Sequence, residues 1–109
     1  MCKVFLSMPM QGLSKEEARK KFDSYAEKAK EVLRDKGICD VEIIDSFIDL
    51  GDGATALDYL IESLKLLKTA DIFCQCHEAS EECTRGCYIE HQVWKEYMQP
   101  SANSLYFSI

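Results

Sequence analysis

Residues 3–46 read KVFLSMPMQGLSKEEARKKFDSYAEKAKEVLRDKGICDVEIIDS and decide the fold, because they contain a strand, a helix and a second strand. The apolar run Lys3–Ser7 predicts a short strand. Ser14, followed by a glutamate three residues later, predicts a helix start of the capping-box type. Apolar residues then recur at helical spacing as far as Gly37. The run Val41–Ser46 predicts the second strand, so the segment has the order of a βαβ unit.

The same alternation continues to the end of the chain. Thr55 is a candidate helix cap, and the helix after it has a stripe that we expect to be buried, made of Leu57, Leu60, Ile61, Leu64 and Leu67. Residues Asp71–Cys76 predict the third strand, and residues 84–98 predict a third helix. Ser104–Ile109 predicts an additional edge strand.

Strands separated by full helical segments are typical of right-handed crossovers and a parallel sheet. We therefore expect one α/β domain over residues 1–109, with three layers and a doubly wound, mainly parallel sheet of four to five strands, as in Rossmann-like or flavodoxin-like folds. Ligands bind such sheets beyond the carboxyl ends of the strands. The segments expected at this edge are Ser7–Gly12, Asp45–Gly53 and Cys76–Gly86.

Composition narrows the classes of function. The 109 residues carry a formal net charge of -6, which argues against a nucleic-acid polymer or an anionic membrane as partner. A single nucleotide remains possible, because a helix N-terminus can bind one in an acidic protein. No run approaches the roughly 18 apolar residues of a membrane span, and the N-terminal apolar run is too short for a signal peptide. We expect a cytoplasmic protein whose six cysteines are reduced thiols.

The segment Thr84–His91 is the most informative for chemistry. Thr84 is a natural N-cap, which places Glu90 in the second turn of a helix, on a face with small and apolar residues. Burying a carboxylate is unfavourable unless the group has a hydrogen-bond or charge partner, so a buried carboxylate often serves a function. Gly86, one turn earlier, leaves room for a ligand, and Arg85 with the helix N-terminus could bind an anion. Alternatively, Glu90 lies at the edge of the helix and reaches water.

The cysteines and histidines suggest a second kind of site. Cys74, Cys76, His77, Cys83 and Cys87 include enough ligands for zinc, although their spacing matches no familiar zinc motif. The alternative, which we favour, is that they are reduced structural thiols and that no metal binds. No G-x-G-x-x-G motif indicates a dinucleotide, and we expect no cofactor.

Four stretches of the chain resemble the nucleoside 2-deoxyribosyltransferase-like superfamily, in particular its short bacterial and phage branch. They are KVFLSMPMQGL (3–13), VEIIDSF (41–47), SLKLLKTADIF (63–73) and RGCYIEHQVWKEY (85–97). The resemblance runs from Lys3 to about Tyr97, and its most specific motif is R-G-C-x-x-E.

This resemblance implies cleavage or transfer of the N-glycosidic bond of a (deoxy)nucleoside or nucleotide. Glu90 is then the nucleophile and forms a glycosyl-enzyme ester. The other implied binding residues are Ser7, Met10 and Gly12 around the sugar or base, Thr84, Arg85 and Gly86 at the 5′ end, and Asp45 and His77 at the same crevice. The alternative function is a nucleotide-binding protein without catalysis.

Two departures from the family pattern accompany the resemblance. The superfamily commonly has an aspartate eight residues before the aspartate that opens the third strand, and this chain has Ser63 there. The loop between residues 76 and 83 is long and acidic, which disfavours a phosphorylated ligand. In the superfamily a C-terminal segment also completes the site of a neighbouring subunit, so we expect a homodimer or larger homo-oligomer. The alternative for Ser104–Ile109 is a plain edge strand.

Overall fold

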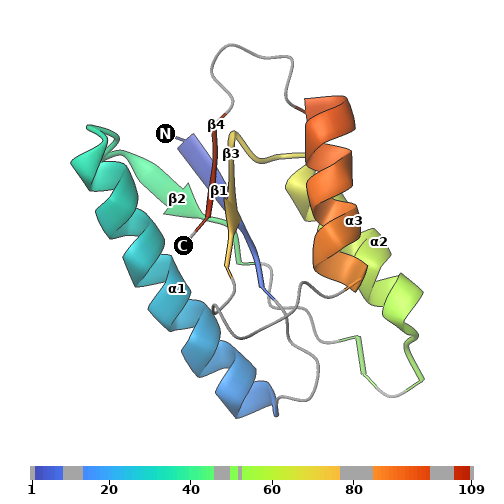
Figure 1. Cartoon of the computed structure of the whole chain (residues 1–109). Helices are drawn as coiled ribbons and strands as arrows, with labels where there is room; N and C mark the ends of the chain where they lie inside the picture. Colours follow the sequence, from blue (N-terminus) through green and yellow to red (C-terminus); the bar gives the residue numbers. More distant parts are fainter. Residues whose placement is uncertain are drawn as a thin grey trace.

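The fold is an α/β sandwich around a parallel sheet (Figure 1). The computed structural model describes residues 2–8, 14–45, 50–51, 53–76, 85–98 and 105–108. Within these residues the sheet has four strands in the order β2-β1-β3-β4, and every neighbouring pair is parallel. The strands are β1 (Cys2–Ser7), β2 (Val41–Ile43), β3 (Ile72–Gln75) and β4 (Leu105–Ser108).

The helices lie on both faces of the sheet, which confirms the predicted three layers. Figure 1 shows α1 (Lys15–Asp35) on one face and α2 (Ala56–Leu67) with α3 (Arg85–Val93) on the other. A π-helical segment, η1 (Trp94–Met98), continues α3. None of the described helices is both long enough and apolar enough to cross a membrane.

Local sequence explains where the first two helices begin. The Ser14 side chain accepts a hydrogen bond from the Glu17 backbone N–H at 3.1 Å at the start of α1. Thr55 and Asp58 form a reciprocal capping box at the start of α2. Gly37, with φ at 86°, takes the left-handed conformation just after α1, where a side chain would be strained.

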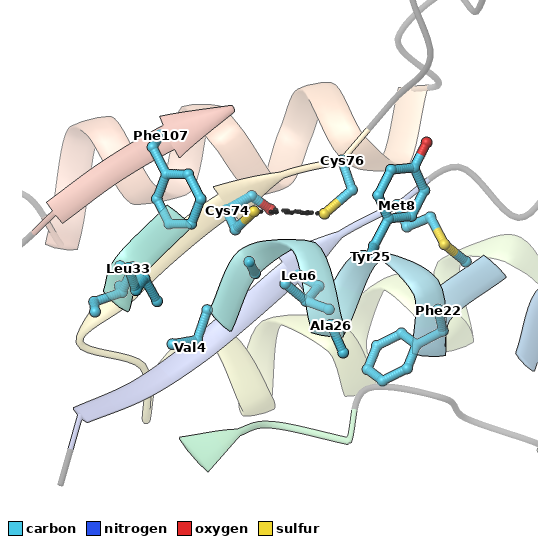
Figure 2. Close-up of a cluster of buried hydrophobic side chains, with 12 residues drawn as sticks. Val4, Leu6, Met8, Phe22, Tyr25, Ala26, Leu33, Cys74, Cys76 and Phe107 are labelled. Carbon is cyan, nitrogen blue, oxygen red and sulfur yellow. Dashed lines mark hydrogen bonds between the residues drawn. The ribbon is translucent and has the colours of Figure 1, made fainter. Parts of the chain in front are cut away.

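The face of the sheet covered by α1 is almost entirely apolar. Alternate residues of the strands point to it, and they pack on one side of α1; the buried cluster comprises Val4, Leu6, Met8, Phe22, Tyr25, Ala26, Ala29, Leu33, Ile72, Cys74, Cys76 and Phe107 (Figure 2). The Cys74 and Cys76 sulfurs are 3.6 Å apart and fully buried. Both thiols therefore behave as small core residues, as expected from their two-residue spacing in a strand.

Aromatic rings dominate the opposite face, which α2 and α3 cover. Phe5, Phe73 and Tyr106 occupy equivalent register positions on β1, β3 and β4. The Phe73 ring lies 6.0 Å from that of Phe5, 5.7 Å from that of Tyr106 and 5.6 Å from that of Trp94, measured between centroids. We call Phe5, Phe73 and Tyr106 the aromatic row.

Two expectations about these elements need correction. β2 ends at Ile43, earlier than the predicted Ser46, although the Ile44 N–H still bonds to the Val4 carbonyl at 2.9 Å. In α2, Leu57 and Ile61 are 63% and 44% exposed, and only the end of the predicted stripe is fully buried. Periodicity identified the apolar side of α2, but only part of that side contacts the sheet layer.

The predicted third helix continues to Met98, but its last turn changes geometry. The wider π-helical turn from Trp94 shifts later side chains around the axis. Trp94 remains in the core, as its position one turn after Glu90 suggests, whereas Tyr97 is 77% exposed. The sequence pattern allows Tyr97 to be a core or an interface residue, and this exposure excludes the core of the chain.

Because Phe73 lies at the centre of the aromatic row, truncating it should remove more packing than any exposed aromatic change. We expect Phe73→Ala to lower the free energy of unfolding by about 3–5 kcal/mol. Tyr97→Ala, the matched control on an exposed ring, should change it by less than about 0.5 kcal/mol. Urea unfolding of both variants measures the difference, and similar values for the two would contradict the burial of Phe73.

Candidate functional site

A buried carboxyl group lies at the carboxyl edge of the sheet. Glu90 of α3 is 7% exposed, so the alternative in which it reaches water is wrong. Its Oε1 accepts a hydrogen bond of 2.8 Å from Oγ of Ser7, the last residue of β1. Ser7 itself is 1% exposed. These are the two buried polar residues in the described core, and they contact each other.

The surroundings of Glu90 favour the neutral carboxyl. Burial raises its pKa from the usual 4.5 to about 7, because a low-dielectric environment disfavours the charged form. The hydrogen bond from Ser7 and the nearby hydroxyl of Ser63 oppose this shift and lower the pKa. Near neutral pH the group therefore exists in both protonation states.

Ser63 brings a third element to the site. It lies on α2, at the position where the resemblance implies an aspartate, and its hydroxyl is close enough to Glu90 to lower the pKa of that carboxyl. The carboxyl is thus contacted from β1 and from α2 while α3 carries it. The residue that differs from the family pattern is therefore a neighbour of Glu90 itself. Where the resemblance implies an aspartate, which could carry a second negative charge, this chain has a neutral hydroxyl.

This arrangement can support nucleophilic or proton-transfer chemistry. In its ionised form Glu90 is a poorly solvated carboxylate, and both described partners that lower its pKa are hydroxyls rather than cations. A carboxylate with little hydration and without a cationic partner keeps its charge available to a ligand. In its neutral form the group can donate a proton. The helix segment carrying it begins at Arg85, near the same edge of the sheet.

The structure places the other predicted site residues as follows. Met10, Gly12, His77 and Thr84 lie outside the described residues. Arg85 and Gly86 form the first two positions of α3, whose side chains are not described at this end. The predicted pocket around the sugar and the 5′ end therefore remains a prediction, apart from the placement of Ser7.

Asp45 takes part in a different interaction. Its Oδ1 lies 2.9 Å from Nη1 of Arg19, and both side chains are more than 40% exposed. Arg19 also approaches Asp23 and stacks over the Phe22 ring on α1. The structure thus brings Asp45 to α1, whereas Glu90 contacts β1 and α2.

His91 follows Glu90 in sequence but serves another part of the fold. Its ring stacks on Tyr106 of β4 with centroids 4.7 Å apart and an interplanar angle of 5°. Burial is the main reason that its pKa is lowered, and Lys95 adds to the shift. Successive helix positions lie about 100° apart, so the His91 ring and the Glu90 carboxyl lie on different sides of α3.

The predicted zinc ligands are only partly described. Cys74, Cys76 and Cys87 are buried thiols that take part in no disulfide. Among the residues that the structure describes, no three potential metal ligands gather. His77 and Cys83 lie outside those residues, so the full predicted set stays untested.

Two residues near Glu90 escaped selection as site residues from the sequence. Ser63 occurs between Leu60 and Leu67 at helical spacing, so it is a polar interruption of the stripe facing inward. That interruption is a usable signal. Gln75 pairs with Ser7 in the register of β1 and β3, and no local pattern indicates such a pairing, because register is a property of the assembled sheet.

The raised pKa of Glu90 makes a prediction about stability. Between pH 4.5 and about 7 the folded chain binds more protons at this group than the unfolded chain, so the contribution of Glu90 to stability falls as pH rises. We expect Glu90→Gln, which stays neutral, to gain about 3 kcal/mol relative to the wild type between pH 4.5 and pH 8. Urea unfolding across this range measures the gap.

The exposed Glu96→Gln is the matched control for this measurement, because it removes one charge from the helical segment that follows Glu90. As a substitution of an exposed side chain, it should change the free energy of unfolding by less than about 0.5 kcal/mol. A constant difference for Glu90→Gln would mean that Glu90 titrates like an exposed carboxyl, contrary to its burial.

No protein-family model, curated protein or solved structure matches the chain. The fold and the contacts of Glu90 therefore stand without a confirmed relative. The resemblance to nucleoside 2-deoxyribosyltransferase-like proteins remains a prediction from the quoted motifs, and function has to be inferred from the geometry around the buried carboxyl.

Proposed function

We propose that the protein cleaves or transfers the N-glycosidic bond of a nucleoside or nucleotide, with Glu90 as nucleophile. The observation that carries this proposal is the buried Glu90 carboxyl, which accepts a hydrogen bond from Ser7 at the carboxyl edge of a parallel sheet. Ligands of doubly wound sheets bind at this edge. The motif resemblance supplies the reaction class.

The reaction has two displacements at the anomeric carbon. A carboxylate oxygen of Glu90 forms a C–O bond there while the C–N bond breaks, and the bonding electron pair leaves with the base, which takes up a proton. In the second step water or another base attacks the same carbon. Glu90 departs as a carboxylate, and the attacking group loses a proton. The acceptor decides between hydrolysis and transfer.

The hydroxyl partners suit this role better than a cation would. A lysine or arginine next to Glu90 would lower its pKa further but would also hold the negative charge that has to be shared with the developing sugar cation. Ser7 and Ser63 orient the carboxyl and lower its pKa without adding charge. The site therefore keeps its nucleophile partly ionised and still reactive near neutral pH.

Several finer points of the proposal come from the sequence. The acidic stretch between residues 76 and 83 favours an unphosphorylated nucleoside over a nucleotide. No cofactor is needed for the two displacements. A homodimer or larger homo-oligomer and a cytoplasmic location remain part of the proposal.

A nucleotide-binding protein without catalysis is the second candidate, and Ser63 favours it. A hydroxyl can hydrogen-bond Glu90 but cannot ionise to assist a leaving base as the implied aspartate would. In that case the pocket binds a nucleoside or nucleotide, and Glu90 recognises a hydrogen-bond donor on it. Ligand binding with no release of base distinguishes this candidate from the enzyme.

Chromatography of deoxyribonucleosides, ribonucleosides and their 5′-monophosphates, with and without a second free base, tests the proposal directly. We expect the wild type to release or exchange a base and Glu90→Gln to lose at least about 10³-fold of that activity, since no nucleophile remains. Glu96→Gln should retain wild-type activity. Because Glu90→Gln should be more stable than the wild type, unfolding would not account for its loss, and a wild type inactive on every substrate would rule out the enzyme.

The pH dependence of that activity should follow the ionisation of Glu90. The nucleophile is the carboxylate, so kcat/KM should rise with pH through a midpoint near 7. Ser7→Ala removes a hydrogen bond that lowers the pKa, so its midpoint should move to higher pH. Ser24→Ala, on the exposed side of α1, should leave the profile unchanged. A kcat/KM that falls with rising pH would instead indicate that Glu90 acts as an acid.

A further inference from the structure

Helix α2 buries little of its own surface within the chain. Leu67 is its one fully buried residue, whereas α1 buries side chains in every turn from Ala18 to Leu33. A helix of 12 residues depends for its stability on packing of its apolar side, because so short a helix is marginal alone in water. Leu57 and Ile61 are nevertheless 63% and 44% exposed. α2 therefore has an apolar surface that the rest of the chain leaves uncovered.

The exposed side chains of α2 lie on one face of the helix. Four of them follow one another at intervals of three or four residues, namely Leu57, Ile61, Lys65 and Lys68. Such spacing keeps the other three within about 40° of Ile61 around the helix axis. Asp58 and Glu62 flank this row along one side. We call these six residues the outer face of α2; Ser63, next to Glu90, is turned about 200° from Ile61.

The charge on the outer face changes sign along the helix. Asp58 and Glu62 lie in its N-terminal half, and Lys65 and Lys68 lie at its C-terminal end. Glu62 and Lys65 form an ion pair of 2.9 Å within the chain, but their side chains are 39% and 67% exposed, so this pair contributes little and can be exchanged for another. Two antiparallel copies of the face place each acidic half against a basic half. The face is thus complementary to itself in that orientation.

A hollow of about 380 Å³ accompanies the acidic half of the outer face. It is lined by Leu50, Ala54, Asp58, Ile61 and Glu62. Apolar side chains beside two carboxylates suit a lysine, whose aliphatic stem packs on apolar surface while its ammonium group reaches a carboxylate. In the antiparallel arrangement Lys65 and Lys68 of a second copy lie over this hollow, and the reciprocal contact forms at the other end.

We propose that the protein forms a homodimer through the outer face of α2, with the two helices antiparallel about a two-fold axis near Ile61. Residue 61 lies close to the middle of Ala56–Leu67, so Leu57 and Ile61 of both copies are covered together. A net charge of -6 on each copy opposes association in general, and the pairing of opposite charges on this face offsets that repulsion. The inference gives a contact for the homo-oligomer that the resemblance implies, and it does not rest on the reaction proposed for Glu90.

Sedimentation velocity of the full chain over a range of concentrations measures the monomer–dimer equilibrium. We expect the wild type to shift from monomer to dimer as its concentration rises. Ile61→Gln should raise the dissociation constant by at least about tenfold, because it places a polar group at the centre of the contact. Tyr97→Gln is the matched control, since Tyr97 is 77% exposed on η1, away from the outer face. A wild type that stays monomeric, or an equal effect of the two substitutions, would overturn the proposal.

An exchange of charge between two variants tests the ion pairs across the interface. Lys65→Glu with Lys68→Glu makes the outer face acidic throughout. Asp58→Asn with Glu62→Lys makes it basic, and asparagine keeps a side-chain oxygen for the capping box with Thr55. Each variant alone should dissociate at concentrations where the wild type is dimeric, because like charges then face each other.

An equimolar mixture of the two charge variants should form a dimer with one copy of each, which native mass spectrometry identifies by its mass. Circular dichroism of each variant shows first that the helices are retained. A mixture of folded variants that stays monomeric would overturn the contact through α2, and so would variants that dimerise alone as tightly as the wild type. Base release by a wild type that is monomeric would keep the proposed enzyme and remove the interface, whereas a dimer that releases no base would do the reverse.

Discussion

The hydrogen bond between Ser7 and Glu90 joins the end of β1 to the second turn of α3, and the placement of the site depends on it. It exists because β1 alternates between the two faces of the sheet. Val4 and Leu6 pack against α1, while Phe5 and Ser7 point to α2 and α3. Strict alternation thus gives one strand both an apolar face for the core and a polar end for Glu90.

The buried position of Glu90 lowers the stability of the folded chain at neutral pH. Its raised pKa means that ionisation at neutral pH destabilises the folded chain, and the Ser7 and Ser63 hydroxyls offset only part of this effect. An apolar residue at position 90 would fit the surrounding face without that loss. A buried titratable group whose ionisation lowers stability is a candidate for a functional role. The same physics that disfavours the carboxylate makes it reactive, because both result from its poor hydration.

The sequence predicted the order of elements, the parallel sheet and the place of Glu90 on a small and apolar helix face, because each depends on spacing along the chain. It predicted less well the features that depend on how helices and strands pack against one another. The α2 stripe was predicted as buried, yet Leu57 and Ile61 remain exposed because the sheet layer covers only part of that side. Gln75 gave no signal at all, since its relation to Ser7 follows from the register of two strands separated by about 65 residues of chain.

The C-terminal strand shows most clearly what assembly adds. The resemblance implies that this segment completes the site of a neighbouring subunit, whereas β4 pairs here with β3 of its own chain. Residues 105–108 cannot form that ladder and extend into a partner at the same time. The pairing is also what brings Tyr106 to Gln75 and to His91. With β4 in this place, residues 105–108 contribute to the sheet of the same chain that carries Glu90.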